Sequence, residues 1–160
     1  MPAYLPFLCL LLAANGSPIL ARLLLGDRLP QPIDGGRRFL DRRPLFGPSK
    51  TWLGLGSAVL LTGALAAPLG VAPAVGFAVG VAAMAGDLLS SFIKRRLGLA
   101  SSRPVPGLDQ LPESLLPAAV AAGPLGLTGA DILLAVTLFC AIEITLSHLL
   151  YRLGLRRYPF

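Results

Sequence analysis

An acid, a hydroxyl and an ammonium group recur along one stretch of the chain, GDLLSSFIKRRLGL (86–99). If this stretch is helical, Asp87, Ser91 and Lys94 occupy positions i, i+4 and i+7, which share one face of a helix. A carboxylate for Mg²⁺, beside a hydroxyl and an ammonium for phosphate oxygens, would form a metal-phosphate site. Alternatively, Asp87 forms an ion pair with Lys94 or Arg95, and the basic run only sets membrane topology. The spacing leaves both interpretations open.

A second acidic pair lies in PGLDQLPES (106–114). Asp109 and Glu113 are four residues apart, so they share a face if a helix begins here. Two carboxylates at a helix start can bind a divalent ion together with water and substrate phosphate. The structural alternative makes Asp109 an N-cap, with Pro112 in the first helical turn.

The polar segment IDGGRRFLDRRPLFGPSKTW (33–52) offers donors for phosphate. Asp34 begins a turn with two glycines, which let a backbone approach a phosphate closely, so Asp34 is a candidate substrate-binding residue. The arginines of this segment are forked donors that suit phosphate. GPSKT (47–51) is similar to the end of a P-loop, but a serine precedes Lys50 where a P-loop has glycine, and no strand precedes the motif.

Two further polar residues lie within apolar segments. Asn15 belongs to NGSP (15–18), where the proline frees a backbone carbonyl one turn earlier. This motif indicates either an opening towards a ligand or a kink that neighbouring helices satisfy. Glu143, inside another apolar stretch, is expected to be neutral or paired with a polar group.

The elements that position these residues are expected to be membrane helices. Apolar residues make up 54% of the 160 residues and charged residues only 14%, and neither 1–21 nor 51–86 contains a charge. A helix needs about 20 apolar residues to cross a bilayer. The sequence therefore predicts an all-α, polytopic integral membrane protein with about five transmembrane helices.

The chain is expected to form one transmembrane domain over residues 1–160. The charge-free stretch 51–86 is too long for one span and is broken by two prolines and a glycine at AAPLGVAP (66–73), which predicts a helical hairpin. The expected helices cover about 3–25, 51–66, 73–94, 111–127 and 131–153, and the expected polar loops about 26–50 and 95–110.

Charge predicts the orientation of these helices. Five spans place both polar loops and the C-terminus on one side, together with all 14 Lys and Arg residues. The positive-inside rule makes this side the cytoplasm of a cell-membrane protein, with the N-terminus outside. The short helix 111–127 is retained as a span because the C-terminal arginines would otherwise lie on the wrong side. Basic residues separated by membrane-length segments exclude a nucleic-acid footprint.

The quoted motifs together resemble the CDP-archaeol synthase family, which is related to the CDP-diacylglycerol synthases (phosphatidate cytidylyltransferases). The resemblance rests on the polar motif of the first helix, the loop around 32–52, the helix end 86–99 and PGLDQL (106–111). It covers about residues 15–116, with the motifs in the same order and the same five-helix layout.

This resemblance implies an enzyme that uses CTP and Mg²⁺ to transfer a cytidylyl group to a lipid phosphate, with release of pyrophosphate. The implied acceptor is an unsaturated isoprenoid diether glycerol phosphate, and the active site faces the cytoplasm. Asp87 and Asp109 match the acidic positions expected to bind Mg²⁺, and Lys94 would contact phosphate during catalysis. The polar positions expected near the nucleotide or lipid phosphate are matched by Asn15, Lys50, Ser91, Lys94 and Arg95. A homodimer is compatible with the sequence.

The chain departs from the family pattern at three places. It has DRR (41–43) where DGR is usual, GPSKT where GDGKT is usual, and Pro112 where an aspartate is typical. Glu113 is the candidate to replace that missing carboxylate as a metal ligand. These departures bear on the lipid acceptor more than on the nucleotide chemistry, so the same chemistry on diacyl phosphatidate or another lipid phosphate is one alternative. The other is a small non-enzymatic transporter or assembly protein, in which the acidic residues serve only as helix caps and ion-pair partners.

Overall fold

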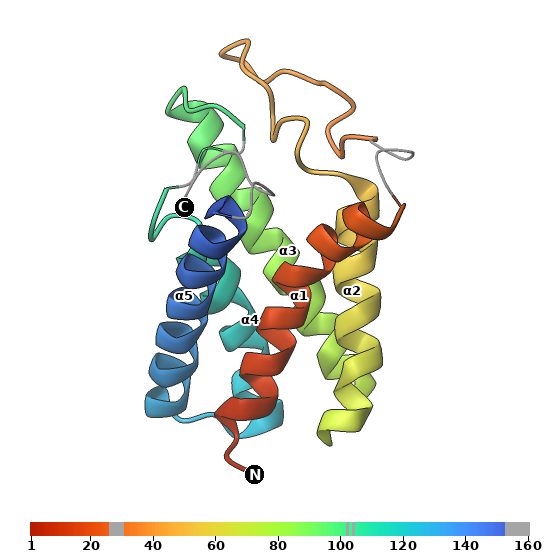
Figure 1. The fold of residues 1–160 in the computed structure, drawn as a ribbon, viewed down its shortest axis with the longest axis vertical. Helices are drawn as coiled ribbons and strands as arrows, with labels where there is room; N and C mark the ends of the chain where they lie inside the picture. Colours follow the sequence, from red (N-terminus) through yellow and green to blue (C-terminus); the bar gives the residue numbers. More distant parts are fainter. Residues whose placement is uncertain (26–30, 102, 104, 153–160) are drawn as a thin grey trace.

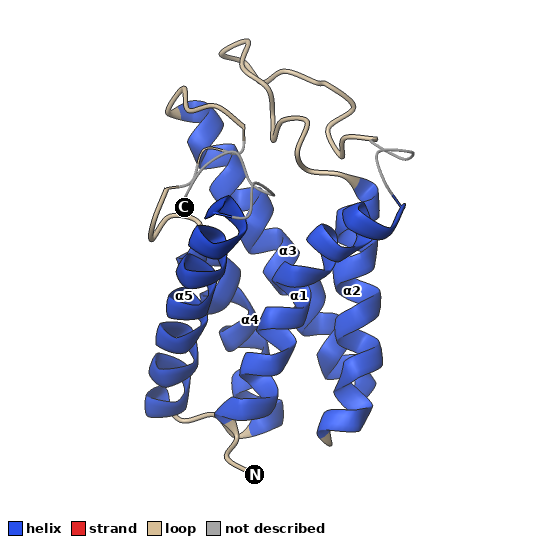
Figure 2. Cartoon of the chain, in the orientation of Figure 1, coloured by secondary structure: helices blue, strands red, loops and turns tan. Residues whose placement is uncertain are grey.

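The all-α fold expected from the sequence is confirmed. The computed structural model describes residues 1–25, 31–101, 103 and 105–152, and these contain five α-helices and no strand (Figures 1 and 2). The helices are α1 (Tyr4–Leu25), α2 (Trp52–Ala66), α3 (Pro73–Arg96), α4 (Gln110–Leu125) and α5 (Gly129–Arg152). Each lies close to a range expected from the sequence, although residue 153, expected in the last helix, lies outside the described residues.

Prolines and glycines delimit the helices. Between α2 and α3, a 3-10 turn (Ala67–Leu69) is followed by Gly70 with φ 72°, a conformation that glycine adopts without strain. Pro73 then occupies the first turn of α3, where its missing N–H is not needed. These features produce the helical hairpin expected from the break in the charge-free stretch.

Successive helices run in alternate directions, so that both polar loops lie at the same end of the bundle (Figure 1). Within the described part of the chain, four helices are long and apolar enough to cross a membrane: α1, α2 with its 3-10 extension, α3 and α5. The chain is therefore a multi-pass membrane protein. Helix α4 has only 16 residues, about 24 Å at 1.5 Å per residue, so its crossing stays a prediction. Arg156 and Arg157 lie outside the described residues.

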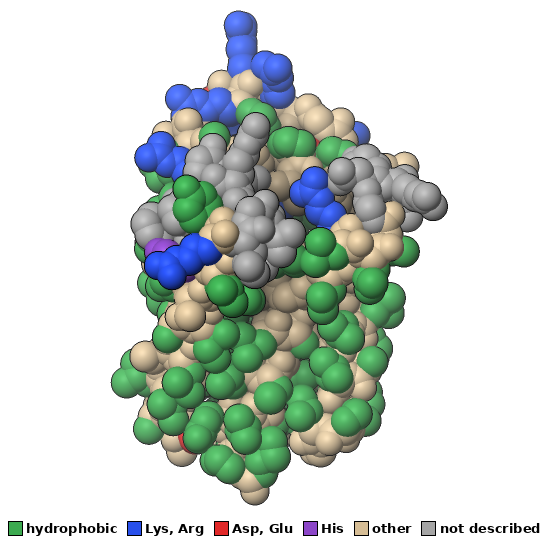
Figure 3. Space-filling view, viewed as in Figure 1, with side chains coloured by type: hydrophobic (Ala, Val, Ile, Leu, Met, Phe, Trp, Pro, Cys, Tyr) green, Lys and Arg blue, Asp and Glu red, His purple; other side chains and the backbone are tan. Residues whose placement is uncertain are grey.

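The outer surface of the bundle is apolar and the loop end is basic. In Figure 3, hydrophobic side chains cover most of this face, whereas the lysines and arginines gather at the loop end. Leu60 and Leu133 are 66% and 70% exposed, a distribution that suits contact with lipid. An outward-facing leucine carries no free-energy cost in a bilayer, because the lipid hydrocarbon is as apolar as the leucine side chain.

Small residues bring the helices of the hairpin together. A Cβ atom added at Gly76 would lie 2.5 Å from the carbonyl oxygen of Thr62, and one at Gly80 would lie 2.9 Å from the Cα of Val59. Neither contact is sterically allowed, so α2 and α3 can pack this closely only with glycine at both positions. Close backbone approach through small residues is the usual basis of helix association in membranes.

Candidate active site

An ion pair joins the first polar loop to the middle of α3. The Nζ atom of Lys50 lies 2.5 Å from Oδ1 and 2.6 Å from Oδ2 of Asp87. The two side chains are only about one fifth exposed. Lys50 is held there because the next residue, Thr51, caps α2 by accepting a hydrogen bond from the N–H of Gly54.

Asp87 also contacts a carboxyl group from α4. The side chains of Asp87 and Glu113 are hydrogen-bonded to each other, and Glu113 is 7% exposed. Gly86 makes this contact possible, because a Cβ atom there would lie 2.2 Å from the carbonyl oxygen of Pro112. Two ionised carboxylates in contact repel each other, so this pair needs a proton or a cation between its members.

A second ion pair lies nearer the end of α3. Lys94 Nζ lies 2.6 Å from Oδ1 of Asp109 and donates a hydrogen bond to the carbonyl oxygen of Arg103. Oδ2 of Asp109 accepts a hydrogen bond from the N–H of Val105 at 2.9 Å. Asp109 stands at the N-cap of α4 without a side-chain capping bond to that helix, so its carboxylate orders the second loop instead.

The first polar loop is folded around Asp34. Its two ends are joined by the hydrogen bond from the N–H of Ile33 to the carbonyl oxygen of Lys50, at 2.8 Å. The carboxylate of Asp34 accepts hydrogen bonds from the N–H groups of Gly36, Phe46 and Gly47 at 2.9–3.0 Å. Burial raises the pKa of Asp34, but these three donors outweigh burial and leave the pKa below its ordinary value.

Arginines fasten this loop to the end of α3. The guanidinium of Arg96 lies 4.9 Å from the ring centroids of both Phe39 and Phe92 and forms an ion pair with Asp41. The guanidinium of Arg43 donates hydrogen bonds to the carbonyl oxygens of Arg95 and Arg96, the last two residues of the helix. The loop is therefore docked on α3, two turns beyond Asp87.

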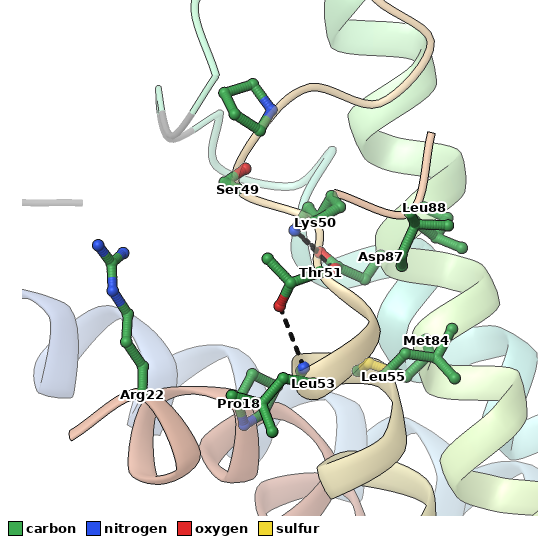
Figure 4. A pocket seen from close by; sticks show the side chains of 13 residues that line it. Pro18, Arg22, Ser49, Lys50, Thr51, Leu53, Leu55, Met84, Asp87 and Leu88 are labelled. Atoms are coloured by element: carbon green, nitrogen blue, oxygen red, sulfur yellow. Dashed lines mark hydrogen bonds and ion pairs between the residues drawn. The ribbon is translucent and has the colours of Figure 1, made fainter. Parts of the chain in front are cut away.

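A pocket of about 180 Å³ opens beside the Lys50–Asp87 pair (Figure 4). It lies between the end of α1, the first turn of α2 and the second half of α3. The end of the first loop closes it on one side. Figure 4 shows Lys50 and Asp87 pointing towards each other, with Arg22 rising from α1 on the side away from α3. The lining residues are Pro18, Arg22, Ile33, Pro48, Ser49, Lys50, Thr51, Leu53, Gly54, Leu55, Met84, Asp87 and Leu88.

Three other predicted residues lie elsewhere. Asn15 lines a smaller pocket between α1 and α5 that also includes Glu143, and its side chain donates to the carbonyl oxygen of Leu11. Ser91 is buried in α3. Arg95 is buried and donates to the carbonyl oxygen of Ala100 at 2.8 Å. None of these three lines the larger pocket, whereas Arg22, which was not a predicted site residue, does.

The arrangement suits chemistry between anions. Two lysines lie among three carboxylates at the loop end of the bundle, beside a pocket with both charged and apolar walls. Among the described residues, no three or more His, Cys, Asp or Glu side chains form a metal-binding group. Mg²⁺ commonly uses only one or two carboxylates and completes its shell with water and substrate phosphate. The Asp87–Glu113 pair therefore fits a hard divalent cation.

Comparison with known proteins agrees with this chemistry. The chain is 48% identical to the CDP-archaeol synthase of Hyperthermus butylicus over 106 residues, 62% of this chain and 60% of that protein. It is 34% identical to the CDP-archaeol synthase of Thermococcus kodakarensis over 158 residues, 92% of this chain and 89% of that protein. The first of these matches thus spans less than two thirds of its relative's length.

A solved structure and a family profile extend the likeness over nearly the whole chain. The structure, of an intramembrane enzyme for archaeal membrane lipid biosynthesis, superposes with a TM-score of 0.75 at 29% identity and covers 88% of this chain and 89% of its own. The profile described as CarS-like, CDP-archaeol synthase, matches residues 2–160. This chain therefore belongs to the CarS-like CDP-archaeol synthase family.

Proposed function

We propose that this protein is a CTP-dependent cytidylyltransferase of the cell membrane that transfers CMP from CTP to a lipid phosphate. The acceptor is an isoprenoid diether glycerol phosphate, and the products are a CDP-lipid and pyrophosphate. Family membership and the names of the relatives support this activity. The observation that carries it is the partly buried Lys50–Asp87–Glu113 cluster beside an amphipathic pocket at the loop end of the bundle.

The reaction joins two anions, and the charged cluster suits this task. A phosphate oxygen of the lipid forms a bond to the α-phosphorus of CTP, and the bond from that phosphorus to the β-phosphate oxygen breaks. Pyrophosphate leaves with the electron pair of the broken bond. Fixed cationic groups lower the barrier by neutralising charge and holding the reacting groups in line. Lys50 and Lys94 supply two such groups, both in pairs with carboxylates.

Mg²⁺ fits the carboxylates of this site. Asp87 and Glu113 would bind the ion, which suits the two contacting carboxyl groups, and Asp109 is a further acidic ligand within the same end of the bundle. When bound, the metal neutralises phosphate charge and favours the departure of pyrophosphate. Lys50 pairs with Asp87 and Lys94 pairs with Asp109, so both lysines would turn towards substrate phosphates as the carboxylates turn towards the metal.

The other predicted residues receive supporting roles in this proposal. Ser91 and Arg95, on the α3 face near Lys94, bind the nucleotide phosphates. Asp34 acts through the loop, because its three backbone hydrogen bonds fix the segment that ends at Lys50. Asn15 lies on α1 and lines a small, mainly apolar pocket together with Glu143 of α5.

The site is proposed to face the cytoplasm, where CTP is available. The described lysines and arginines occupy the two polar loops and the helix ends at the same end of the bundle, as the positive-inside rule requires of a cytoplasmic face. The lipid acceptor reaches the same site from the bilayer.

The activity is tested with the full chain purified in detergent. The protein is incubated with Mg²⁺, labelled CTP and a panel of lipid phosphates that includes a diether glycerol phosphate and a diacyl phosphatidate. We expect CDP-lipid and pyrophosphate in equal amounts, with the diether preferred, and no product after chelation of the metal. Equal or faster turnover of the diacyl lipid would contradict the proposed acceptor. No product with any lipid phosphate would favour a transporter or assembly protein.

A further inference from the structure

The pocket beside Lys50 has both polar and apolar walls. Each kind of side chain comes partly from the first loop and partly from the helices. The polar wall includes Arg22, Ser49, Lys50, Thr51 and Asp87, and the apolar wall includes Pro18, Ile33, Leu53, Leu55, Met84 and Leu88. A ligand that fills this pocket therefore needs a charged head joined to an apolar body.

The size of the pocket favours the lipid acceptor over the nucleotide. Sites that enclose a whole small molecule usually measure about 300–1,000 Å³, whereas this pocket measures about 180 Å³. A nucleoside triphosphate exceeds that volume, but a glycerol phosphate head with the first carbons of its chains does not. The apolar wall also gives a triphosphate nothing to bind, while it suits a hydrocarbon chain.

The pocket borders the surface that faces lipid. Arg22 belongs to the last turn of α1, and the nearby Leu20, Leu23 and Leu24 are 53%, 64% and 83% exposed. Arg22 is the single charged residue of α1. Long basic side chains at such a position reach towards the membrane interface, where lipid phosphates lie.

We infer that Arg22 and Lys50 together bind the phosphate of the acceptor lipid in this pocket, with the lipid chains along its apolar wall. The forked guanidinium of Arg22 suits two phosphate oxygens at once, and Lys50 provides a point charge from the opposite side. CTP then binds on the other side of Asp87, where Glu113 and the Lys94–Asp109 pair lie. This assignment rests on the proposed function, since it divides that site into an acceptor side and a nucleotide side.

The kinetic test compares Arg22→Gln and Arg22→Lys with Arg152→Gln, which removes a basic residue from the same end of the bundle, on α5. We expect Arg22→Gln to raise KM for the diether glycerol phosphate at least tenfold and to leave KM for CTP within twofold. Arg22→Lys should fall between this variant and the parent, and Arg152→Gln should match the parent. An unchanged KM for the lipid, or a raised KM for CTP alone, would overturn the assignment.

A binding measurement separates this inference from the proposed activity. Thermal unfolding in detergent is followed with the diether glycerol phosphate alone, and separately with CTP and Mg²⁺. The lipid should raise the Tm of the parent but not of Arg22→Gln, whereas CTP should raise both equally, which also shows that the variant is folded. Arg22-dependent lipid binding without any product would contradict the proposed function and leave the binding site in place. An active parent whose lipid-induced shift survives in Arg22→Gln would contradict only the inference.

Discussion

The ammonium group of Lys50 lies within 2.6 Å of both carboxylate oxygens of Asp87, across 37 residues of sequence. One partner ends the first polar loop and the other lies in the membrane-length helix α3. The pair therefore brings the docked loop, the α2–α3 hairpin and the pocket together at one point. Changes at either residue should affect both the stability of the bundle and the handling of phosphate.

Replacement of Asp87 by asparagine should remove activity without preventing insertion. A neutral amide cannot replace a carboxylate that binds a cation and pairs with Lys50, so we expect kcat/KM to fall by at least about 100-fold. The measurement is CDP-lipid formation by protein extracted from membranes in normal amounts. Asp131→Asn, at the opposite end of the bundle, is the matched control. Activity near that of the parent would exclude Asp87 from the site.

Removal of Lys50 alone should destabilise the protein more than removal of the whole pair. Lys50→Met leaves the partly buried carboxylate of Asp87 without its cation, which we expect to lower the free energy of unfolding by about 2 kcal/mol. Adding Asp87→Asn removes the stranded charge and should restore part of that loss. Thermal unfolding of both single variants and the double variant gives the coupling energy. Strictly additive effects would show that the pair contributes no coupling.

Gly86→Ala should separate α3 from α4. The added methyl group would clash with the backbone of Pro112, and overpacking of this kind costs about 1–3 kcal/mol. Because the same shift moves Glu113 away from Asp87, activity should fall together with Tm. Gly123→Ala, in α4, places its methyl group in open space and serves as the control. A Gly86→Ala protein with the parent's Tm and rate would refute the close approach of these helices.

Arg96→Ala should loosen the first polar loop from α3. The substitution removes two cation–π contacts and the ion pair with Asp41. A loss of about 1 kcal/mol would make opening of the loop roughly fivefold more frequent. Hydrogen exchange of residues 31–50 should accelerate accordingly, while exchange in the core of α5 stays unchanged. Arg37→Ala, an exposed arginine of the same loop, should leave exchange as in the parent.

Acid should open the same loop through Asp34. The folded-state pKa of Asp34 is lowered, so its contribution to stability is complete above the ordinary aspartate pKa. That contribution is lost as the pH falls below about 4 and through the folded-state pKa. Fluorescence of Trp52, the single tryptophan, reports on the loop because the backbone N–H of Trp52 donates a hydrogen bond to the carbonyl oxygen of Gln31. Asp34→Asn should give a weaker but pH-independent signal over this window.

The helices could be predicted because their signal is local. Charge-free windows, prolines and glycines lie within each segment, and they define α1, α2 and α3 without knowledge of any tertiary contact. Helix α4 carries a weaker signal: its 16 residues contain Pro117 and Pro124, and it has a polar first turn. Because α4 is short, the prediction that it crosses the membrane rests on the charge pattern of the whole chain and not on the residues of α4.

The partners within the site could not be predicted, because helix spacing describes only one helix at a time. The i, i+7 relation suggested Asp87 with Lys94, and the i, i+4 relation suggested Asp109 with Glu113. The structure pairs Lys50 with Asp87, Glu113 with Asp87, and Lys94 with Asp109. These pairings depend on the docked loop and on the α3–α4 approach at Gly86. The roles of these residues in catalysis remain predictions.

Arg22 was missed for a related reason. A single arginine at the end of an apolar helix is the usual signature of membrane orientation, and nothing in the sequence separates that use from a ligand contact. Arg22 lines a pocket only because the end of α1 packs beside the first turn of α2 and the second half of α3. The family's GDG pattern could not be used to locate the pocket, because residues 47–49 are GPS in this chain.

The Lys50–Asp87 pair has a consequence for biogenesis, because both partners precede α4 in the chain. A nascent protein that has reached only the second loop already contains the countercharge for its intramembrane aspartate. The carboxylate of Asp87 can therefore form its ion pair before the later helices are inserted. Glu113 contacts Asp87 only after α4 has packed against α3. The order of synthesis thus supplies the cation before the second carboxyl group arrives.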